Sequence, residues 1–179
     1  AQALERSAAL QNFLRGIERR ALRIAELSTR DRDDALDLVQ DAMLAFARNY
    51  ADKPEADWTP LFHRVLDSRI LDFHRRNQVR RRWRVWFTRD DDDDKDNPLE
   101  QVADPHDPGP LLRLADGQMR QALDPALRAL PLRQRQAFLL RLWEGLDVAQ
   151  TAAAMRCSEG SVKTHLSRAL AALRPKLEA

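Results

Sequence analysis

The sequence predicts an all-α fold: two small helical domains joined by an acidic flexible linker. Leu, Ala and Arg, which all favour helix, dominate a chain of 179 residues that has only 5 glycines and 1 tyrosine. Apolar residues recur at spacings of three and four along both ends of the chain, as on one face of a helix. Between them, residues 90–110 carry nine acids, one lysine and four of the nine prolines. We therefore expect domains at 1–89 and 111–179, with the linker at 90–110.

The first domain is predicted to begin with two helices. The apolar stripe of the first comprises Leu10, Phe13 or Leu14, Ile17, Ala21 and Ile24. The second helix should follow Asp31 or Asp33, since either carboxylate can cap the free N–H groups of a helix start. Its predicted apolar stripe comprises Leu36, Val39, Met43, Phe46 and Tyr50.

A third helix is predicted after a loop at residues 49–58, which contains Pro54. Thr59 suits the N-cap position, and Pro60 suits the first helical position, where a missing N–H costs nothing. The predicted buried stripe comprises Phe62, Val65 or Leu66, Ile70 and Phe73. This helix is thus expected to complete a three-helix domain.

An arginine block follows this helix, with seven arginines and no acid between His74 and Arg89. Because arginine neutralises phosphate, the block favours a nucleic-acid surface. Trp86 and Phe87, which are interleaved with the arginines, are predicted to close the domain core. The acidic run that follows is either a solvated spacer between the domains or a negatively charged segment that occupies a positively charged channel meant for nucleic acid.

The second domain carries the sharpest local pattern. We expect one helix, or two broken near Pro125, then a helix from about Pro131 to Trp143 that ends at Gly145. A short helix at 147–155, a tight turn and a longer helix at 159–173 then form a helix-turn-helix. Ser158 can cap the longer helix, whose N-terminal end would enter the major groove. An ordinary helical hairpin in a bundle is the alternative interpretation of this pattern.

The stretch LRALPLRQRQAFLLRLWEGLDVAQTAAAMRCSEGSVKTHLSRALAAL closely resembles region 4 of the extracytoplasmic-function (ECF) sigma factors. The resemblance implies that this domain reads the minus-thirty-five promoter element. The implied DNA-facing residues of the longer helix are Ser161, Lys163, Thr164, His165, Ser167 and Arg168. Two residues depart from the family pattern: Arg156 stands where glycine is usual, and Thr151 stands where an aliphatic residue is usual. We expect Arg156 to adopt a left-handed conformation and Thr151 to weaken packing.

The stretch DALDLVQDAMLAFAR resembles region 2.2 of the same family. Asp37, Gln40 and Asp41 are spaced i, i+3, i+4 and should share one polar face of a helix. The spacing alone fits a solvated surface. The resemblance implies that this face docks on the β′ clamp helices of RNA polymerase.

The stretch LFHRVLDSRILDFHRR resembles regions 2.3 and 2.4 more loosely, which implies a role at the minus-ten element. We expect strand separation to use base stacking and phosphate contacts. The candidate residues for this element are Trp58, His63, Arg64, Arg75, Arg76 and Arg80. A tryptophan at a loop end can equally be a core anchor, so both roles stay open for Trp58.

The sequence as a whole is thus typical of an alternative sigma factor. Implied partners are core RNA polymerase (β′ clamp helices and β flap), promoter DNA and an anti-sigma factor. A two-domain helix-turn-helix regulator that does not act as a sigma factor is the alternative. We expect no enzyme activity, catalytic residue, metal, cofactor or small-molecule substrate, because the four histidines show no metal-ligand spacing and no nucleophile has an accompanying constellation. One cysteine and no membrane-spanning stretch fit a cytoplasmic protein. An anti-sigma factor could hold it at the inner membrane face.

Overall fold

The computed structural model describes residues 1–87 and 117–178, and every regular element in these two ranges is helical. The N-terminal elements are α1 (Gln2–Thr29), α2 (Arg32–Tyr50), the 3-10 turn η1 (Glu55–Asp57) and α3 (Trp58–Phe87). The C-terminal elements are α4 (Gly117–Ala129), α5 (Leu132–Phe138), the π-helical segment η3 (Leu139–Trp143), α6 (Val148–Met155) and α7 (Glu159–Leu177). The all-α prediction is confirmed. The acidic segment at 90–110 and the side chains of Trp86 and Phe87 lie outside the described residues.

The start of α2 follows from one side chain. Asp31 has extended backbone, and its carboxylate accepts a hydrogen bond from the backbone N–H of Asp34 at 2.9 Å. The predicted cap at this position is therefore confirmed. The predicted apolar stripe was wrong at one residue, because Leu36 is 43% exposed and Leu38 lies in the core instead.

Three other predicted boundaries differ from the structure. The helix α3 begins at Trp58, so Thr59 and Pro60 lie inside its first turn, where proline still removes no hydrogen bond. Pro125 lies inside α4 and does not end it. The last helix continues beyond Leu173 to Leu177. Helix ends are the features that sequence patterns place least accurately.

Aromatic side chains build the core of the N-terminal domain. Phe13, Phe46, Trp58 and Phe62 form a cluster whose ring centroids lie 5.4 to 6.3 Å apart. Such separations are typical of favourable tilted and edge-to-face pairs. The cluster ties α1, α2 and α3 into one unit.

Apolar residues from all four helices fill the core of the C-terminal domain. Its buried side chains include Leu123, Leu127, Phe138, Leu140, Met155, Val162, Leu166 and Leu173. Gly145, at φ +72°, ends the π-helical segment, and the N–H of Leu146 reaches back to the carbonyl of Leu140 at 3.0 Å. The predicted helix stop at Gly145 is confirmed.

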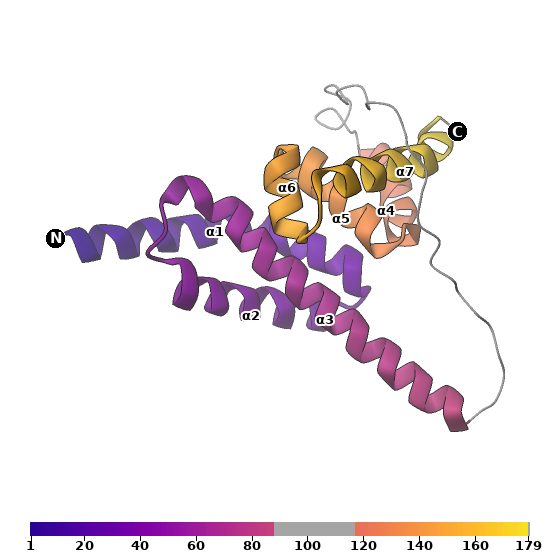
Figure 1. The fold of residues 1–179 in the computed structure, drawn as a ribbon, viewed down its shortest axis with the longest axis horizontal. Helices are drawn as coiled ribbons and strands as arrows, with labels where there is room; N and C mark the ends of the chain where they lie inside the picture. The colour runs from indigo at the N-terminus through magenta and orange to yellow at the C-terminus, as the bar shows by residue number, and fades with distance from the viewer. Residues whose placement is uncertain (88–116, 179) are drawn as a thin grey trace.

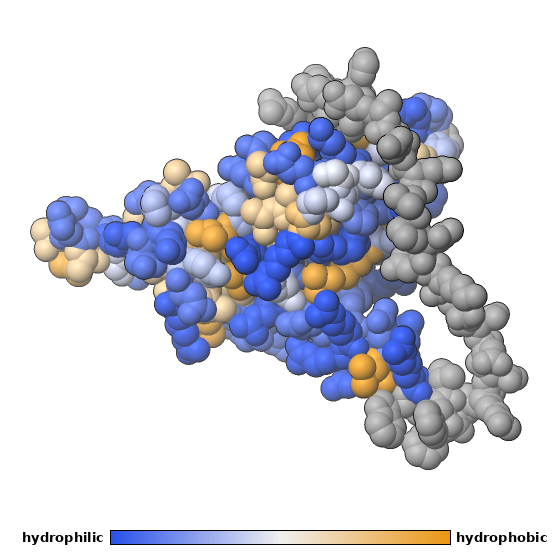
Figure 2. All heavy atoms as spheres, in the orientation of Figure 1, coloured by the Kyte–Doolittle hydropathy of each residue, from blue (hydrophilic) through white to orange (hydrophobic). Residues whose placement is uncertain are grey.

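The two domains pack against each other. α6 lies across α3, and α4 contacts α1 (Figure 1). Hydrophilic residues predominate along α1 and α3 on the face shown in Figure 2, with hydrophobic residues in smaller patches. No helix within 1–87 or 117–178 is long and apolar enough to cross a membrane. The direct contact between the domains is a feature that local sequence patterns do not predict.

Candidate nucleic-acid interface

The polar face of α2 is fully available. Asp37, Gln40 and Asp41 are all exposed, while the opposite face of the helix packs into the core. The predicted shared face therefore exists. Two exposed apolar side chains flank it, Leu36 at 43% and Leu44 at 54%, and sequence reasoning did not assign either of them to the site. The exposed surface of α2 therefore combines polar side chains with two apolar ones.

The helix-turn-helix is built by two caps and a strained turn. The side chains of Asp147 and Gln150 form a reciprocal capping box at the start of α6. The hydroxyl of Ser158 caps α7 by accepting from the N–H of Ser161 at 3.1 Å. Arg156 ends α6 at φ 53° and ψ 47°. Both the Ser158 cap and the left-handed Arg156 are confirmed predictions.

Thr151 is accommodated in a way the sequence did not predict. Its side chain is fully buried, and its hydroxyl donates to the carbonyl of Asp147 at 2.7 Å. Because a buried hydroxyl that finds a partner avoids most of its desolvation cost, Thr151 is a satisfied residue of the α6 interior.

The outer face of α7 presents the predicted minus-thirty-five residues. Lys163 and Arg168 are exposed, and the four others are partly buried: Ser161, Thr164, His165 and Ser167. The opposite face holds the buried residues Val162, Leu166, Ala169 and Leu173. The two exposed cations and the buried apolar residues thus lie on different faces of the helix.

The structure divides the predicted minus-ten residues into two groups. Arg75, Arg76 and Arg80 are exposed along the second half of α3. Trp58 is 1% exposed, lies in the aromatic cluster, and donates from Nε1 to the carbonyl of Lys53 at 2.9 Å. Of the two roles left open for Trp58, the structure favours the core role. Because its side chain is buried, Trp58 has no accessible surface for the predicted contact with DNA in this arrangement.

His63 and Arg64 lie where the two domains meet. His63 is fully buried, and its Nε2 lies 3.0 Å from Oε2 of Glu144, while Arg64 is half-buried. The carboxylate of Glu144 also accepts from Nε of Arg20 at 3.1 Å. Burial raises the pKa of Glu144, but the hydrogen bond and charge of His63, together with Arg20, lower it below the usual value. In the described arrangement, His63 faces protein and not solvent.

Two further titratable residues of α3 face the C-terminal domain. Burial raises the pKa of Asp67 to about 8, against the opposing charge of Arg133 on α5. Burial also lowers the pKa of His74, and the nearby charge of Arg135 adds to the effect. Sequence reasoning missed both of these residues and Glu144. The only available signal was that Asp67 follows His63 by four residues, beside the apolar stripe of the helix.

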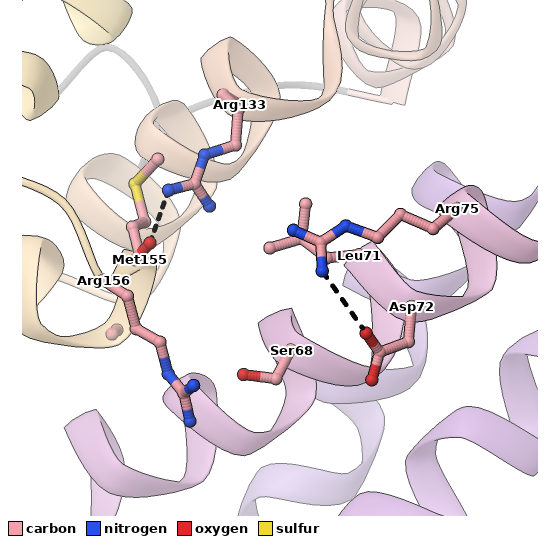
Figure 3. A pocket seen from close by; sticks show the side chains of 8 residues that line it. Ser68, Leu71, Asp72, Arg75, Arg133, Met155 and Arg156 are labelled. Atoms are coloured by element: carbon pink, nitrogen blue, oxygen red, sulfur yellow. Dashed lines mark hydrogen bonds and ion pairs between the residues drawn. The ribbon is translucent and has the colours of Figure 1, made fainter.

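A cleft of about 410 Å³ lies at the junction, between α3 and the turn of the helix-turn-helix (Figure 3). Ser68, Asp72 and Arg75 line it from α3, and Arg133, Met155 and Arg156 line it from the other domain. Arg133 is held in place by a hydrogen bond to the backbone carbonyl of Met155. No group of three or more metal-ligating side chains occurs in the part of the chain that the structure describes.

Comparison with known proteins finds two family matches, one in each half of the chain. Residues 10–80 match the model of sigma-70 region 2, and residues 120–173 match the model of sigma-70 region 4. A structure of the sigma factor RpoE with the anti-sigma factor NepR, from Bartonella quintana, superposes with a TM-score of 0.59 at 22% identity. That match covers 94% of this chain and 96% of the other. The fold over both domains is therefore that of a sigma factor.

Named relatives are closer in sequence. The RNA polymerase sigma-E factor of Streptomyces antibioticus is 34% identical over 81% of this chain and 71% of its own length. The ECF RNA polymerase sigma factor SigM of Mycobacterium tuberculosis is 30% identical over 92% of this chain and 75% of its own. These matches do not favour a helix-turn-helix regulator of another kind. The chain belongs to the ECF sigma factors of bacterial RNA polymerase.

Proposed function

We propose that three surfaces of this alternative sigma factor divide its work in promoter-specific transcription initiation. The polar face of α2 binds core RNA polymerase, the basic side of α3 reads the minus-ten element, and the outer face of α7 reads the minus-thirty-five element. The single observation that carries this division is the exposure of Asp37, Gln40 and Asp41 on one face of α2. These residues occupy the position at which the family resemblance implies docking on the β′ clamp helices.

The helix α7 is suited to DNA by its electrostatics. Its N-terminal N–H groups and the positive end of its dipole favour phosphate, and Ser158 occupies only part of that N-terminus. Lys163 and Arg168 add two exposed cations on the same helix. We infer that phosphate contacts place this helix in the major groove and that its smaller polar side chains read base edges.

The basic half of α3 is suited to a backbone contact. Arg75, Arg76 and Arg80 are exposed on consecutive turns and would neutralise phosphates along one strand. We infer domain boundaries near 89/90 and 110/111, which fall between the two matched family regions. The chain would act by binding and not by catalysis, in the cytoplasm where polymerase and promoter meet.

We further propose an anti-sigma factor as regulator. The structurally similar RpoE was solved with one bound. A partner of this kind would cover the surfaces that polymerase uses, and could hold the chain at the inner membrane face.

The test is reconstitution. Purified chain mixed with core polymerase and a promoter library should give specific transcripts, and the double variant Asp37→Arg, Asp41→Arg should lose polymerase binding while it keeps its helical circular dichroism. The matched control is Glu5→Arg, Glu18→Arg, which reverses two exposed carboxylates on α1 and should bind polymerase normally. If wild-type chain fails to associate with core polymerase in a pull-down, the proposed function is wrong. If the control loses binding as well, the α2 face is not the specific site.

A further inference from the structure

The cleft between α3 and the turn of the helix-turn-helix is lined mainly by positive charge. Arg75 lines it from α3, while Arg133 on α5 and Arg156 at the end of α6 line it from the other domain. Figure 3 shows the three side chains extending from both domains toward the space between them. Asp72 is the one acid among the described residues that line the cleft. Three guanidinium groups against one carboxylate leave the described lining with an excess of positive charge.

Arg133 is held in position by its own domain. Its Nη1 donates to Oε1 of Gln136 at 2.9 Å, and its Nη2 donates to the backbone carbonyl of Met155. Both acceptors are neutral, so neither cancels the charge of the guanidinium. Asp67, the acid on α3 whose charge would oppose that of Arg133, is mostly protonated at about pH 7 because burial raises its pKa to about 8. Arg133 is therefore a fixed cation whose charge remains available at the cleft.

The other two arginines are free to bind a ligand. Within residues 1–87 and 117–178, the side chain of Arg156 forms no ion pair and no hydrogen bond. Arg75 pairs with Asp72 at 3.9 Å, where both side chains are more than half exposed. Because an exposed ion pair at that separation contributes little, the guanidinium of Arg75 can turn toward an anion in the cleft.

The backbone of Arg156 makes this third cation particular to the chain. Arg156 ends α6 at φ 53° and ψ 47°, in the left-handed region that favours glycine. Glycine is also the usual residue at this position of the ECF pattern. An arginine here brings a guanidinium to the cleft at the cost of a strained backbone, which a glycine would avoid.

The size and lining of the cleft indicate the class of ligand. Its volume of about 410 Å³ lies within the usual range of small-molecule sites, about 300–1,000 Å³. Guanidinium groups donate paired N–H bonds that match phosphate oxygens, and several of them around one cavity favour a group with more than one negative charge. Leu71, Ala154 and Met155 add an apolar wall. A bare inorganic ion would leave that wall unused, whereas the organic part of a larger phosphate would pack on it.

We propose that this cleft is a binding site for a small organic diphosphate of the nucleoside diphosphate class, held by Arg75, Arg133 and Arg156. The guanidinium groups bind the phosphate oxygens, and the organic part of the ligand lies on the apolar wall. Both domains contribute cations, so the complete site exists where α3 and the helix-turn-helix lie together. The proposal goes beyond the function proposed above and does not depend on which surfaces bind polymerase or the promoter elements.

Isothermal titration calorimetry of the full-length chain with ADP tests the site, at fixed ionic strength and without divalent cations. Arg156→Gln removes the charge of an exposed side chain, so the fold should survive, and it should weaken ADP binding about tenfold. Arg75→Gln should also weaken it. The matched control is Arg174→Gln, which removes the same charge from an exposed position near the end of α7 and should bind ADP as wild type does. Circular dichroism checks the helical content of each variant.

Pyrophosphate is the second probe. It has the diphosphate but no organic part, so it should bind the wild-type chain more weakly than ADP. Equal affinity for the two would overturn the organic part of the proposal.

Two outcomes would overturn the site as a whole. One is the absence of heat with millimolar ADP, and the other is an equal loss of ADP binding in Arg156→Gln and Arg174→Gln, which would indicate a general effect of charge. If ADP does not bind while Arg156→Gln weakens binding to duplex DNA, then Arg156 serves nucleic-acid phosphates instead. Association with core polymerase is measured separately, so failure of this site and failure of the proposed function are distinguishable.

Discussion

The two helices assigned to promoter DNA, α3 and α7, differ in what controls access to them. On α7, Lys163 and Arg168 are exposed, and the start of the helix is capped by the adjacent Ser158, whose hydroxyl accepts from the N–H of Ser161. On α3, Arg75 is exposed but His63 is sealed by Glu144, which lies 81 residues away in sequence. The helix proposed to read the minus-thirty-five element is thus organised locally, whereas the helix proposed to read the minus-ten element is organised by a contact between domains.

That difference explains why the two helices should respond differently to change. A substitution on the outer face of α7 alters one surface and leaves the fold alone. A substitution on α3 alters the core, the domain contact or the DNA surface, depending on which side of the helix it occupies. Substitutions on each side of α3 therefore test the core, the domain contact and the proposed DNA surface separately.

The largest effect should come from the side of α3 that faces the core. Trp58→Ala removes the largest buried side chain of the aromatic cluster and should destabilise the chain by about 3–5 kcal/mol. Urea unfolding followed by circular dichroism measures the loss. The control is Trp143→Ala, since Trp143 is 37% exposed and should cost much less. A Trp58→Ala chain that keeps its stability but loses minus-ten DNA binding would restore the DNA role.

A smaller effect, dependent on pH, should come from the side of α3 that faces the other domain. The pKa of Asp67 is about 8 in the packed, folded chain because of burial, against 3.8 for an ordinary aspartate, so the folded chain holds a proton that the unfolded chain releases. The folded chain should therefore become less stable as pH rises from about 4 to about 8. Asp67→Asn should stabilise it by about 1–3 kcal/mol at the upper end of that window and remove this pH dependence.

The contribution of Glu144 to stability should depend on pH in the opposite direction to that of Asp67. Its pKa is lowered in the packed state, so its contribution is present above the ordinary glutamate pKa and is lost as pH falls through its own. Urea unfolding at about pH 5 and at about pH 8.5 isolates the effect of Asp67, because the Glu144 contribution is present at both values. Stability of the Asp67→Asn chain that falls toward high pH as steeply as in wild type would exclude Asp67 as the source. Arg133, whose charge opposes the effect of burial on the pKa of Asp67, is present in both the wild-type and the Asp67→Asn chain.

The features that could be predicted from the sequence are those organised locally, and the features that could not are those that depend on contacts between helices or domains. Periodicity and capping residues predicted the helices, the helix-turn-helix, the Asp31 and Ser158 caps, and the shared polar face of α2, because each depends on residues within a few positions of one another. The exposure of Leu36 could not be decided in this way. Leu36 and Leu38 both suit an apolar stripe, and the angle at which α2 meets α1 and α3 decides which one is buried.

The candidate site was predictable in part for the same reason. The exposed residues of α2 and α7 needed only a helix and its polar face. The burial of His63 needed knowledge of Glu144 and Arg20, on two other elements. Trp58 shows the same limit, because a tryptophan at a helix start suits both a core and a stacking surface until its neighbours are placed.

A further prediction concerns the exposed side of α7. Lys163→Ala should weaken binding to duplex promoter DNA about tenfold, roughly 1.4 kcal/mol, and reduce the salt dependence by about one phosphate contact. Stability should not change, because the side chain is exposed. Lys176→Ala, on the same helix but at its far end, is the control and should have less effect. Equal losses in the two variants would mean that α7 offers only a general positive charge.

The smallest effect separates two arginines with the same backbone strain. Arg156 at φ 53° and Arg30 at φ 62° both occupy the left-handed region, which costs a residue with a Cβ about 1 kcal/mol. Arg156→Gly should therefore raise the free energy of unfolding by about 0.5–1 kcal/mol. Arg30→Gly relieves the same strain but deletes a hydrogen bond to the carbonyl of Arg128 across the domain junction. Its net gain should be smaller in the full-length chain, and a gain equal to that of Arg156→Gly in urea unfolding would show that the junction adds nothing to stability at that point.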